Sequence, residues 1–333
     1  MDNKIKLQHG DGGKLTNELI ENLFYKSFGN NILLKGLDSG IFPIEKGKMA
    51  FTTDSFVVKP IFFRGGDIGK LAICGTINDL VVSGAKPLYL STAFIIEEGF
   101  SMESLKEIVN SMVDTCNNTG VKIITGDTKV VPKGSVDGLY INTSGIGIVD
   151  EEFNMGGIEE DDEILITGSI GDHGTSIAID RYELSVQGNL ESDCAPLNKV
   201  LENLEEYFPY IKLMKDPTRG GLGTILNEIS KFTSLSIHIF EDKIPIRREV
   251  KGVCDILGLD PMYMACEGRM VIVVKKEYAK KVLEKLRILE EGKEAEIIGN
   301  FTFEKTRTVY MENSFGGLKI INTLENAMIP RIC

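Results

Sequence analysis

The sequence predicts an α/β protein with α+β character, built from two domains with mixed sheets and a flexible C-terminal tail. Short apolar segments with the spacing of strands alternate with longer segments of helical spacing along the whole chain. A length of 333 residues is long for one hydrophobic core. A polar stretch at 150–162, rich in aspartate and glutamate, separates two halves of similar size. We therefore expect domains at 1–155 and 156–322, followed by the tail at 323–333.

In the first half, helices and strands are expected to alternate. Thr16 is a candidate N-cap for a short helix, and Asp67 and Ser101 are candidate starts of two longer ones. The helix after Ser101 has the clearest pattern, because apolar residues recur at three- and four-residue spacing as far as Cys116. Strands are expected at 50–58, 88–96, 121–125 and 139–149.

The second half shows the same alternation. A strand is expected at 163–167, before a glycine-rich segment at 168–174. That segment follows a strand as a nucleotide-binding loop does, but it lacks GxGxxG spacing, so a Rossmann domain is not supported. Helices are expected at 198–207, 221–232 and 277–286, and further strands at 236–240, 270–274, 296–301, 306–310 and 318–321.

Composition and charge restrict the classes of partner. The formal net charge of −12 would repel nucleic acid and anionic membranes, so neither is expected as a partner. The N-terminus has no apolar signal sequence, and no apolar run reaches the roughly 18 residues of a membrane span. We therefore expect a cytoplasmic location. The six cysteines include no CxxC pair and the histidines number three, which argues against a zinc or iron–sulfur site.

Four aspartates stand in short polar insertions between apolar segments: Asp11, Asp54, Asp79 and Asp127. Carboxylate oxygens without histidine or cysteine are the ligands that Mg²⁺ prefers, together with phosphate oxygens. Taken singly, each aspartate is better explained as a turn residue or a helix cap. Their recurrence at the ends of expected elements favours a shared metal site.

The segment Asp216-Pro217-Thr218-Arg219-Gly220-Gly221 is a candidate phosphate contact. It combines an arginine, two glycines and the start of a helix, where backbone N–H groups are available to an anion. It is not a P-loop, because no GxxxxGK[ST] occurs in the chain. The alternative is an ordinary turn that leads into a helix.

Lys129 and Glu267 are isolated charges among small or apolar neighbours. A carboxylate in such a setting can act as a general base, and a lysine can neutralise a developing phosphate charge. Taken alone, each such residue is more often a surface charge or a member of a structural ion pair.

The chain ends at Cys333, so nothing follows the thiol to hinder an approaching reactant. Pro330 stiffens the preceding backbone, and Arg331 places a cation two residues from the sulfur. One interpretation is an arm that carries a group covalently bound to sulfur. The other is a chain that happens to end in cysteine.

Together these motifs resemble a known family. The segments that carry the resemblance are His9–Gly13, Phe51–Ser55, Asn78-Asp79, Gly126-Asp127-Thr128, Asp216–Gly221 and Pro330–Cys333. They are similar to the ATP-binding superfamily of aminoimidazole ribonucleotide synthetase, selenophosphate synthetase and thiamine-monophosphate kinase. Within it, the chain resembles the HypE family of hydrogenase maturation factors from about residue 7 to residue 333. The opening and terminal motifs are the most specific.

The resemblance implies a two-domain aminoimidazole ribonucleotide synthetase-like fold that forms a homodimer through its N-terminal domain and binds ATP and Mg²⁺ near the dimer interface. It also implies a reaction. The carbamoyltransferase HypF loads a carbamoyl group onto the terminal cysteine, and ATP-dependent dehydration converts it to a thiocyanate. The cyano group then passes to iron on the HypC–HypD complex, as a cyanide ligand of NiFe hydrogenase.

The resemblance also implies roles for single residues. Cys333 would carry the group, Glu267 would act as the base, and Lys129 would be an active-site lysine. Mg²⁺ would be held by Asp54, Asp79 and Asp127, and ATP would be contacted by those aspartates and by Asn78, Thr218, Arg219 and Gly220. Two alternatives remain: a passive carrier of the carbamoyl or cyano group, and another ATP-dependent member of the superfamily. A selenophosphate synthetase is disfavoured, because the loop at 9–13 contains no thiol.

Overall fold

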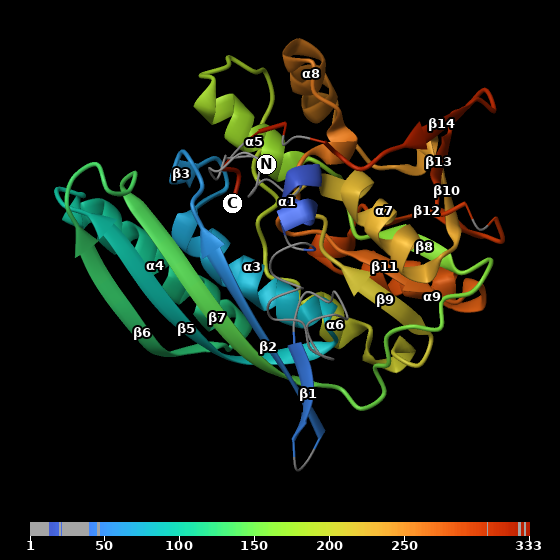
Figure 1. Cartoon of the computed structure of the whole chain (residues 1–333), viewed down its shortest axis with the longest axis horizontal. Coiled ribbons are helices and arrows are strands. Elements are labelled where there is room, and N and C mark those ends of the chain that lie inside the picture. The colour runs from blue at the N-terminus through green and yellow to red at the C-terminus, as the bar shows by residue number, and fades with distance from the viewer. Residues whose placement is uncertain are drawn as a thin grey trace.

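The computed structural model describes residues 13–19, 21, 40–44, 47–304, 306–325, 328–329 and 331–333. These residues form two mixed sheets with helices packed against them, which confirms the predicted α/β architecture (Figure 1). The strands of the first sheet lie within 40–149, and the strands of the second lie within 163–321.

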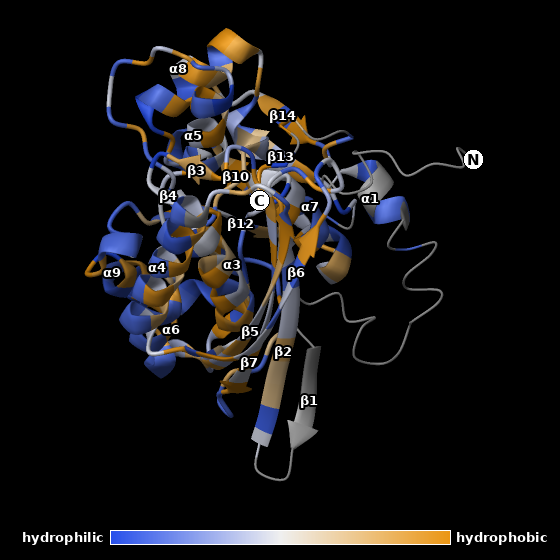
Figure 2. Cartoon of the chain, turned by 90° about the vertical axis from the view of Figure 1, so that its left-hand side faces the viewer, coloured by the Kyte–Doolittle hydropathy of each residue, from blue (hydrophilic) through white to orange (hydrophobic). Residues whose placement is uncertain are grey.

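The first sheet has the strand order β1-β2-β7-β5-β6. Its strands are β1 (Gly40–Ile44), β2 (Gly47–Phe56), β5 (Ala85–Glu97), β6 (Lys122–Val131) and β7 (Leu139–Val149). All neighbours are antiparallel except β5 and β6. The helices α3 (Ile68–Val82) and α4 (Met102–Thr119) pack on the same side of this sheet (Figure 2). A short helix, α1 (Lys14–Leu19), and a hairpin of β3 (Phe62–Phe63) and β4 (Gly66–Asp67) complete this part.

Helix α3 is the central helix of the molecule. Its N-cap is Asp67, as the sequence predicted, and the Asp67 carboxylate accepts hydrogen bonds from the N–H groups of Gly69 (2.6 Å) and Lys70 (3.2 Å). Buried residues lie all around the helix, because it packs against the first sheet on one side and against the second domain on the other. The N-cap at Ser101 of α4 is also confirmed.

The second sheet has the strand order β14-β13-β10-β12-β8-β11-β9. Its strands are β8 (Glu163–Ile166), β9 (Ile211–Lys215), β10 (Ser236–Phe240), β11 (Val271–Val274), β12 (Glu296–Thr302), β13 (Val309–Glu312) and β14 (Leu318–Ile321). The helices of this half are α5 (Asp172–Arg181), α6 (Asn198–Asn203), α7 (Gly221–Thr233), α8 (Arg248–Leu257) and α9 (Lys276–Leu286). Helix α7 packs on one face of the sheet, and α9 packs on the other.

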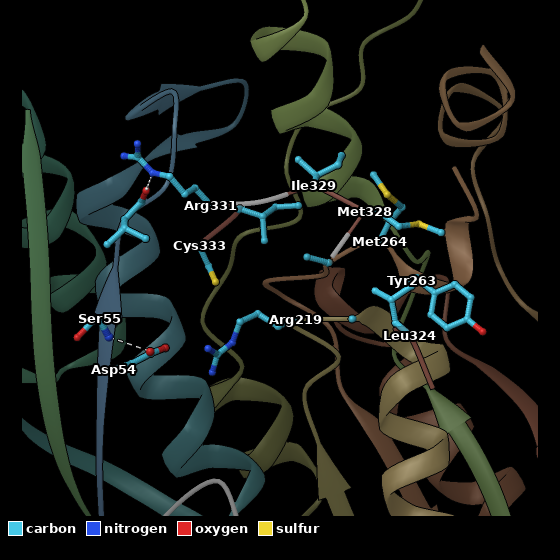
Figure 3. Close-up of a pocket in the computed structure, with 14 residues that line it drawn as sticks. Asp54, Ser55, Arg219, Tyr263, Met264, Leu324, Met328, Ile329, Arg331 and Cys333 are labelled. Atoms are coloured by element: carbon cyan, nitrogen blue, oxygen red, sulfur yellow. Dashed lines mark hydrogen bonds between the residues drawn. The ribbon is translucent and has the colours of Figure 1, made fainter. Parts of the chain in front are cut away.

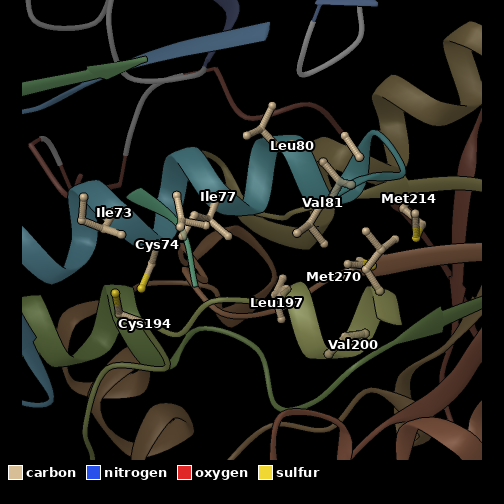
Figure 4. Close-up of a cluster of buried hydrophobic side chains, with 14 of the residues drawn as sticks. Ile73, Cys74, Ile77, Leu80, Val81, Cys194, Leu197, Val200, Met214 and Met270 are labelled. Atoms are coloured by element: carbon tan, nitrogen blue, oxygen red, sulfur yellow. The ribbon is translucent and has the colours of Figure 1, made fainter. Parts of the chain in front are cut away.

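One hydrophobic cluster crosses from the first domain into the second. Figure 4 shows its centre, where side chains of α3 meet side chains of the second domain. The residues drawn there include Ile73, Ile77, Leu80 and Val81 from the first domain and Leu197, Val200, Met214 and Met270 from the second. Because this core is shared, the two domains are held in a fixed relation by apolar burial as well as by hydrogen bonds.

Two local expectations were wrong, and two helices were not foreseen. The sequence predicts that the strand at 121–125 ends before a turn at Gly126-Asp127-Thr128, but these residues lie inside β6, because backbone pairing with β5 overrides the turn preference of Gly-Asp. Thr16 lies inside α1 and does not cap it. The glycine-rich segment at 168–174 runs into α5, which was not foreseen, and neither was α8. Asp11 lies outside the described residues.

The C-terminal tail, expected to be flexible, is docked in the structure. Ile329 is buried, and Ile332 and Cys333 pack against the shared hydrophobic core. The tail therefore has a defined resting position between the two domains. No helix in the described part of the chain is long and apolar enough to cross a membrane.

Candidate active site

The terminal cysteine lies at a cavity of about 190 Å³ between the two domains. The first domain contributes Asp54 of β2, and the second contributes Arg219 just before α7. Figure 3 shows the Cys333 sulfur, the Arg219 guanidinium and the Asp54 carboxylate pointing toward one another. The structure thus brings together three residues that are far apart in the sequence and that the sequence had marked as candidates.

The tail reaches this cavity by pairing with the backbone that follows β2. The Val57 N–H donates to the Cys333 carbonyl (3.1 Å), and the Lys59 N–H donates to the Arg331 carbonyl (3.2 Å). This spacing of two residues on each segment is that of antiparallel pairing. The Arg331 Nε also donates to the Val57 carbonyl (3.0 Å), and its Nη1 donates to the Asp137 carboxylate (2.7 Å).

The guanidinium of Arg219 is a positive charge facing the cavity. Negative charge on Cys333 raises the pKa of Arg219 most, and burial opposes that rise. Three carboxyl groups raise it further: those of Asp54, Asp79 and Glu267. The arginine is therefore a cation that attracts anionic groups from both domains and from the tail.

Backbone geometry around Arg219 depends on two glycines. Gly220 (φ +76°) and Gly221 (φ +57°) both have left-handed backbones, and a Cβ on Gly221 would lie 2.6 Å from the Met264 carbonyl oxygen. No side chain caps α7, which starts here at Gly221. Its first N–H groups and the Arg219 guanidinium form a donor set suited to phosphate oxygens. The backbone of Thr218 supports the turn, because the Gly221 N–H donates to the Thr218 carbonyl (3.2 Å).

Glu267 is a carboxyl group buried near this cavity, with 2% of its surface exposed. Its Oε1 atom has no hydrogen-bond partner among the described residues. Burial raises the pKa of Glu267 well above its usual range, and the negative charges of Cys194 and of nearby aspartates raise it further. The group therefore binds a proton strongly, which suits an acid–base catalyst.

Asp54 and Asp79 supply carboxylates from the first domain. Burial raises the pKa of Asp54, whereas the positive charge of Arg219 and a hydrogen bond from the Ser55 N–H lower it. The Thr52 hydroxyl donates to the Asp79 carboxylate (2.7 Å). The two aspartates are hard oxygen donors on the same side of the sheet as Arg219, which is a donor set compatible with Mg²⁺ and phosphate.

Asn78, for which a phosphate contact is predicted, is hydrogen-bonded across the two domains. Its amide nitrogen donates to the carbonyls of Ala195 (3.0 Å) and Glu267 (3.1 Å), and its oxygen accepts from the Leu197 N–H (2.8 Å). Both amide protons and one of the two lone pairs of the oxygen of this buried side chain are used between the two domains. The structure therefore shows Asn78 as a bridge between domains, beside the backbone of Glu267.

Asp127 and Lys129 lie away from the cavity of their own chain. They pair with each other on β6 (3.1 Å), where both are exposed. The sheet order separates β6 from β2 by two strands, and register with Ala93 places Asp127 on the face opposite to α3. The expected convergence of three aspartates does not occur within one chain. Among the described residues, no group of three His, Cys, Asp or Glu side chains is arranged to hold a metal ion.

Sequence reasoning assigned no role to His173 and did not single out Asp193, and the structure places both at the site. The His173 Nε2 contacts the Ile332 carbonyl oxygen (2.7 Å). The Asp193 carboxylate accepts from the N–H groups of His173 (3.1 Å) and Glu267 (3.2 Å). The signal available in the sequence was the glycine-rich segment at 168–174, which contains His173 but matches no motif of known spacing.

Comparison with known proteins identifies the family. The AIR synthase related protein family matches this chain with its N-terminal domain over residues 36–149 and its C-terminal domain over residues 159–312. Carbamoyl dehydratase HypE of Bradyrhizobium diazoefficiens is 43% identical over 99% of this chain and 96% of its own length. The Escherichia coli protein of the same name is 41% identical over 99% of this chain and 100% of its own length. The chain belongs to the HypE family.

Solved structures agree with this membership of the HypE family. The chain resembles HypE in the crystal structure of a HypE–HypF complex with a TM-score of 0.87 and 46% identity, covering 92% of this chain and 99% of that one. It resembles HypE in complex with ATP with a TM-score of 0.83 and 41% identity, covering 99% and 100%. The resemblance inferred from the sequence motifs is therefore confirmed, and the family is one of carbamoyl dehydratases of hydrogenase maturation.

Proposed function

We propose that this protein dehydrates a carbamoyl group bound to the sulfur of its own Cys333, using ATP, and so forms a thiocyanate. The observation that carries the proposal is the position of Cys333, whose sulfur points into the cavity toward Arg219 and Asp54, near the buried carboxyl of Glu267. A passive carrier would not need a cation, carboxylates and a buried acid–base group around its thiol. The reaction converts the thiocarbamate and ATP into the thiocyanate, ADP and phosphate, so atoms balance.

The residues around the cavity fit the polyphosphate of ATP. Arg219 and the N-terminal N–H groups of α7 would bind phosphate oxygens, and Asp54 and Asp79 would hold Mg²⁺ together with those oxygens. ATP supplies the phosphoryl group that turns the carbamoyl oxygen into a phosphate leaving group. Support comes from the solved HypE structure with ATP, which this chain resembles along its whole length.

Glu267 is the residue we assign to proton transfer. Dehydration of the carbamoyl group removes two N–H protons, so a base is needed beside the nitrogen. Burial holds Glu267 protonated in the resting protein, so it would act as a base only after that proton has left, and its raised pKa then makes the ionised form a strong proton acceptor. Its unpartnered Oε1 atom is available for the contact with the nitrogen. Arg219 would stabilise the negative charge that develops on the oxygen as the phosphate leaves.

The partners proposed for the protein follow from the family. The HypE–HypF complex supports HypF as the carbamoyltransferase that loads Cys333. The HypC–HypD complex would receive the cyano group. Because the docked tail lies in the cavity, Cys333 has to leave its docked position to meet either partner. The cytoplasmic location predicted from the sequence stays a prediction.

A second copy of the chain is also part of the proposal. Asp127 and Lys129 lie on the face of the first sheet that α3 and α4 do not cover, together with exposed apolar side chains. We name this the open face. If two open faces pack together in a homodimer, Asp127 and Lys129 of one copy approach the cavity of the other. In such a homodimer, Asp127 and Lys129 could have the roles expected for them although they lie far from Asp54 of their own chain.

Mass spectrometry of the intact protein tests the reaction. The protein is incubated with HypF, carbamoyl phosphate and ATP, and the loaded protein is then given or denied ATP. We expect one carbamoyl group on Cys333, followed by ATP-dependent loss of one water. Cys333→Ala should fold normally, because the tail docks through its backbone, and should gain no adduct. Cys116→Ala, which changes a thiol on α4, is the matched control and should react as the wild type does.

Two outcomes would contradict this function. If no carbamoyl group appears on Cys333, the cysteine is an ordinary chain end. If the group appears but never loses water in the presence of ATP, the protein is a passive carrier.

A further inference from the structure

His173 has a defined protonation pattern in the structure. Its ring is fully buried at the start of α5, its Nε2 lies 2.7 Å from the Ile332 carbonyl oxygen, and its Nδ1 lies 2.8 Å from the Ser192 hydroxyl. A carbonyl oxygen only accepts hydrogen bonds, so Nε2 carries the proton. The Ser192 hydroxyl then donates to Nδ1. Burial lowers the pKa of His173, which agrees with a neutral ring.

The histidine is held firmly by its surroundings. The ring packs edge-on against Phe63, with centroids 5.4 Å apart. Its backbone N–H donates to the Asp193 carboxylate (3.1 Å), and the Ser192 hydroxyl accepts from the Cys194 N–H (3.0 Å). These contacts come from Phe63 on one side and from the segment 192–194 on the other, so the ring has little freedom to turn away from the tail.

His173 is hydrogen-bonded to the peptide group that joins Ile332 to the reactive residue, Cys333. The carbonyl of Ile332 and the N–H of Cys333 belong to one planar peptide, so fixing that carbonyl fixes the orientation of the peptide group from which the Cys333 Cα extends. The hydrogen bond from the Val57 N–H to the Cys333 oxygen (3.1 Å) holds the other side of that Cα, and the two contacts together restrict where the side chain can lie. The tail is also held by part-buried hydrogen bonds at Arg331, to the Val57 carbonyl and from Arg181, whereas the ion pair of Arg331 with Asp137 lies at an exposed position. A buried hydrogen bond resists competition from water, whereas an exposed ion pair contributes little.

The segment 192–194, which contacts His173, also holds the proposed base, Glu267. The Asp193 carboxylate accepts from the backbone N–H groups of Glu267 (3.2 Å) and Gly268 (3.3 Å) as well as from His173. The tail anchor and the acid–base group are therefore tied to one buried carboxylate. A shift of His173 would therefore be transmitted to Glu267 through the side chain of Asp193.

We propose that His173 is a positioning residue that docks the C-terminal tail and aims the Cys333 sulfur into the cavity. The docking follows from the contacts alone, whereas its consequence for catalysis rests on the function proposed above. A loaded tail held by His173 would keep the carbamoyl group beside Arg219 and Glu267 during dehydration. HypF needs the tail undocked, so loading would not depend on His173.

The rate at which Cys333 is alkylated in the folded protein measures docking of the tail. This measurement does not depend on the catalytic activity of the protein. The other five cysteines are buried, so iodoacetamide added to the folded protein should report on Cys333, with the site identified by peptide mapping. His173→Leu keeps most of the ring volume and removes the donor, so Cys333 should react about tenfold faster, as expected for loss of one buried hydrogen bond. His173→Gln restores a donor to Ile332 and an acceptor for Ser192, and should react nearly as slowly as the wild type. His238→Leu on β10 is the matched control and should not change the rate.

Single-turnover dehydration of protein already loaded by HypF gives the second measurement. His173→Leu should slow the ATP-dependent loss of water by about tenfold or more, because the reacting group is held in place less often. Its rate of loading by HypF should be unchanged or higher. His173→Gln should restore dehydration. This split between loading and dehydration distinguishes positioning from a general loss of structure.

Several results would overturn the proposal. If Cys333 of His173→Leu is alkylated at the same rate as Cys333 of the wild type, docking of the tail does not depend on His173. Slow dehydration in both His173→Leu and His173→Gln, with unchanged alkylation, would assign the histidine a purely structural role. If His173→Leu does not fold, Ser192→Ala decides, since loss of its hydroxyl should also speed alkylation, and an unchanged rate would contradict docking by this ring. If the wild type itself never loses water, the proposed function fails, and the alkylation rates still decide whether His173 docks the tail.

Discussion

At the scale of single residues, the buried carboxyl of Glu267 combines two properties. It has an Oε1 atom without a hydrogen-bond partner in the described part of the chain, and its pKa is raised well above the ordinary value of 4.5. The structure supports the backbone on each side of it through Asp193 and Asn78. The side chain itself is left available, which is expected of a group that exchanges protons with a ligand and not of one that stabilises the fold.

Glu267→Gln should therefore change how stability depends on pH. Above pH 4.5 the carboxyl ionises in the unfolded chain, while burial keeps it protonated in the folded protein. The free energy of unfolding of the wild type then falls as pH rises from 4.5 through the folded pKa. Glutamine cannot ionise, so the melting temperature of the variant relative to the wild type should increase between pH 5 and pH 8.

The same variant, Glu267→Gln, should accept the carbamoyl group and stop before dehydration.

Thermal unfolding across this pH range is the measurement, with Glu228→Gln as the control. Glu228 is a partly exposed carboxylate on α7 that pairs with Lys215. Its replacement should change stability by an amount that does not grow with pH in this range. A constant difference between Glu267→Gln and the wild type would show that Glu267 is already ionised in the folded protein at pH 5.

At the scale of elements, the turn before α7 sets the position of Arg219. Gly221 has a φ of +57°, and an added Cβ would lie 2.6 Å from the Met264 carbonyl oxygen and 2.8 Å from that of Met262. Gly221→Ala should therefore destabilise the fold by about 1–3 kcal/mol, from backbone strain and the close contact together. It should also weaken ATP binding, because the N–H groups of α7 would move.

Urea unfolding of Gly221→Ala and Gly252→Ala separates this effect from a general response to alanine. Gly252 lies within α8, and an added Cβ there meets no atom within 4 Å. Gly252→Ala should stabilise the protein by about 0.5–1 kcal/mol, because alanine loses less backbone entropy in a helix. Equal midpoints for Gly221→Ala and the wild type would mean that the turn can relax around a side chain.

Elements with strong local signals were predictable from the sequence. Helix α4 has both an N-cap at Ser101 and helical spacing, and β10 has apolar residues bounded by turns, so both were expected close to their observed bounds. Gly126-Asp127-Thr128 was misjudged, because its local preference for a turn is outweighed by pairing with β5. Local sequence does not contain that information, since the pairing depends on residues about 35 positions earlier.

The site was predictable as a set of residue types and not as a geometry. Asp54, Arg219 and Cys333 carried recognisable chemistry, and the structure brings them to one cavity. Docking of the tail was not predictable, because it depends on backbone groups at Val57 and on the ring of His173. Neither shows any local pattern that points to residue 333.

At the scale of the whole molecule, the open face of the first sheet is the surface that, among the described elements, α3 and α4 leave uncovered. Phe51, Tyr89, Ile95 and Ile148 are 40–45% exposed on β2, β5 and β7. Strand register places Phe51 beside Ile146 and Ile146 beside Tyr89, so these apolar side chains form a continuous row across three strands. A contiguous apolar patch on a sheet is typical of an interface between protein subunits.

Phe51→Asp should therefore disrupt the proposed homodimer. A charge at the β2 end of the apolar row would be buried without a partner if two open faces packed together, which is strongly unfavourable. We expect sedimentation to show a dimer for the wild type and a monomer for Phe51→Asp. Because Asp127 and Lys129 would reach the cavity only from a second copy, the monomer should also lose ATP-dependent dehydration while it keeps its fold.

Phe315→Asp is the matched control for this experiment. Phe315 is 95% exposed in the turn between β13 and β14, away from the first sheet, so the same substitution there should leave both the dimer and the reaction unchanged. A dimer that persists in Phe51→Asp would place the interface elsewhere. A monomeric Phe51→Asp with full activity would show that each cavity is complete within one chain, and Asp127 and Lys129 would then have no part in the reaction.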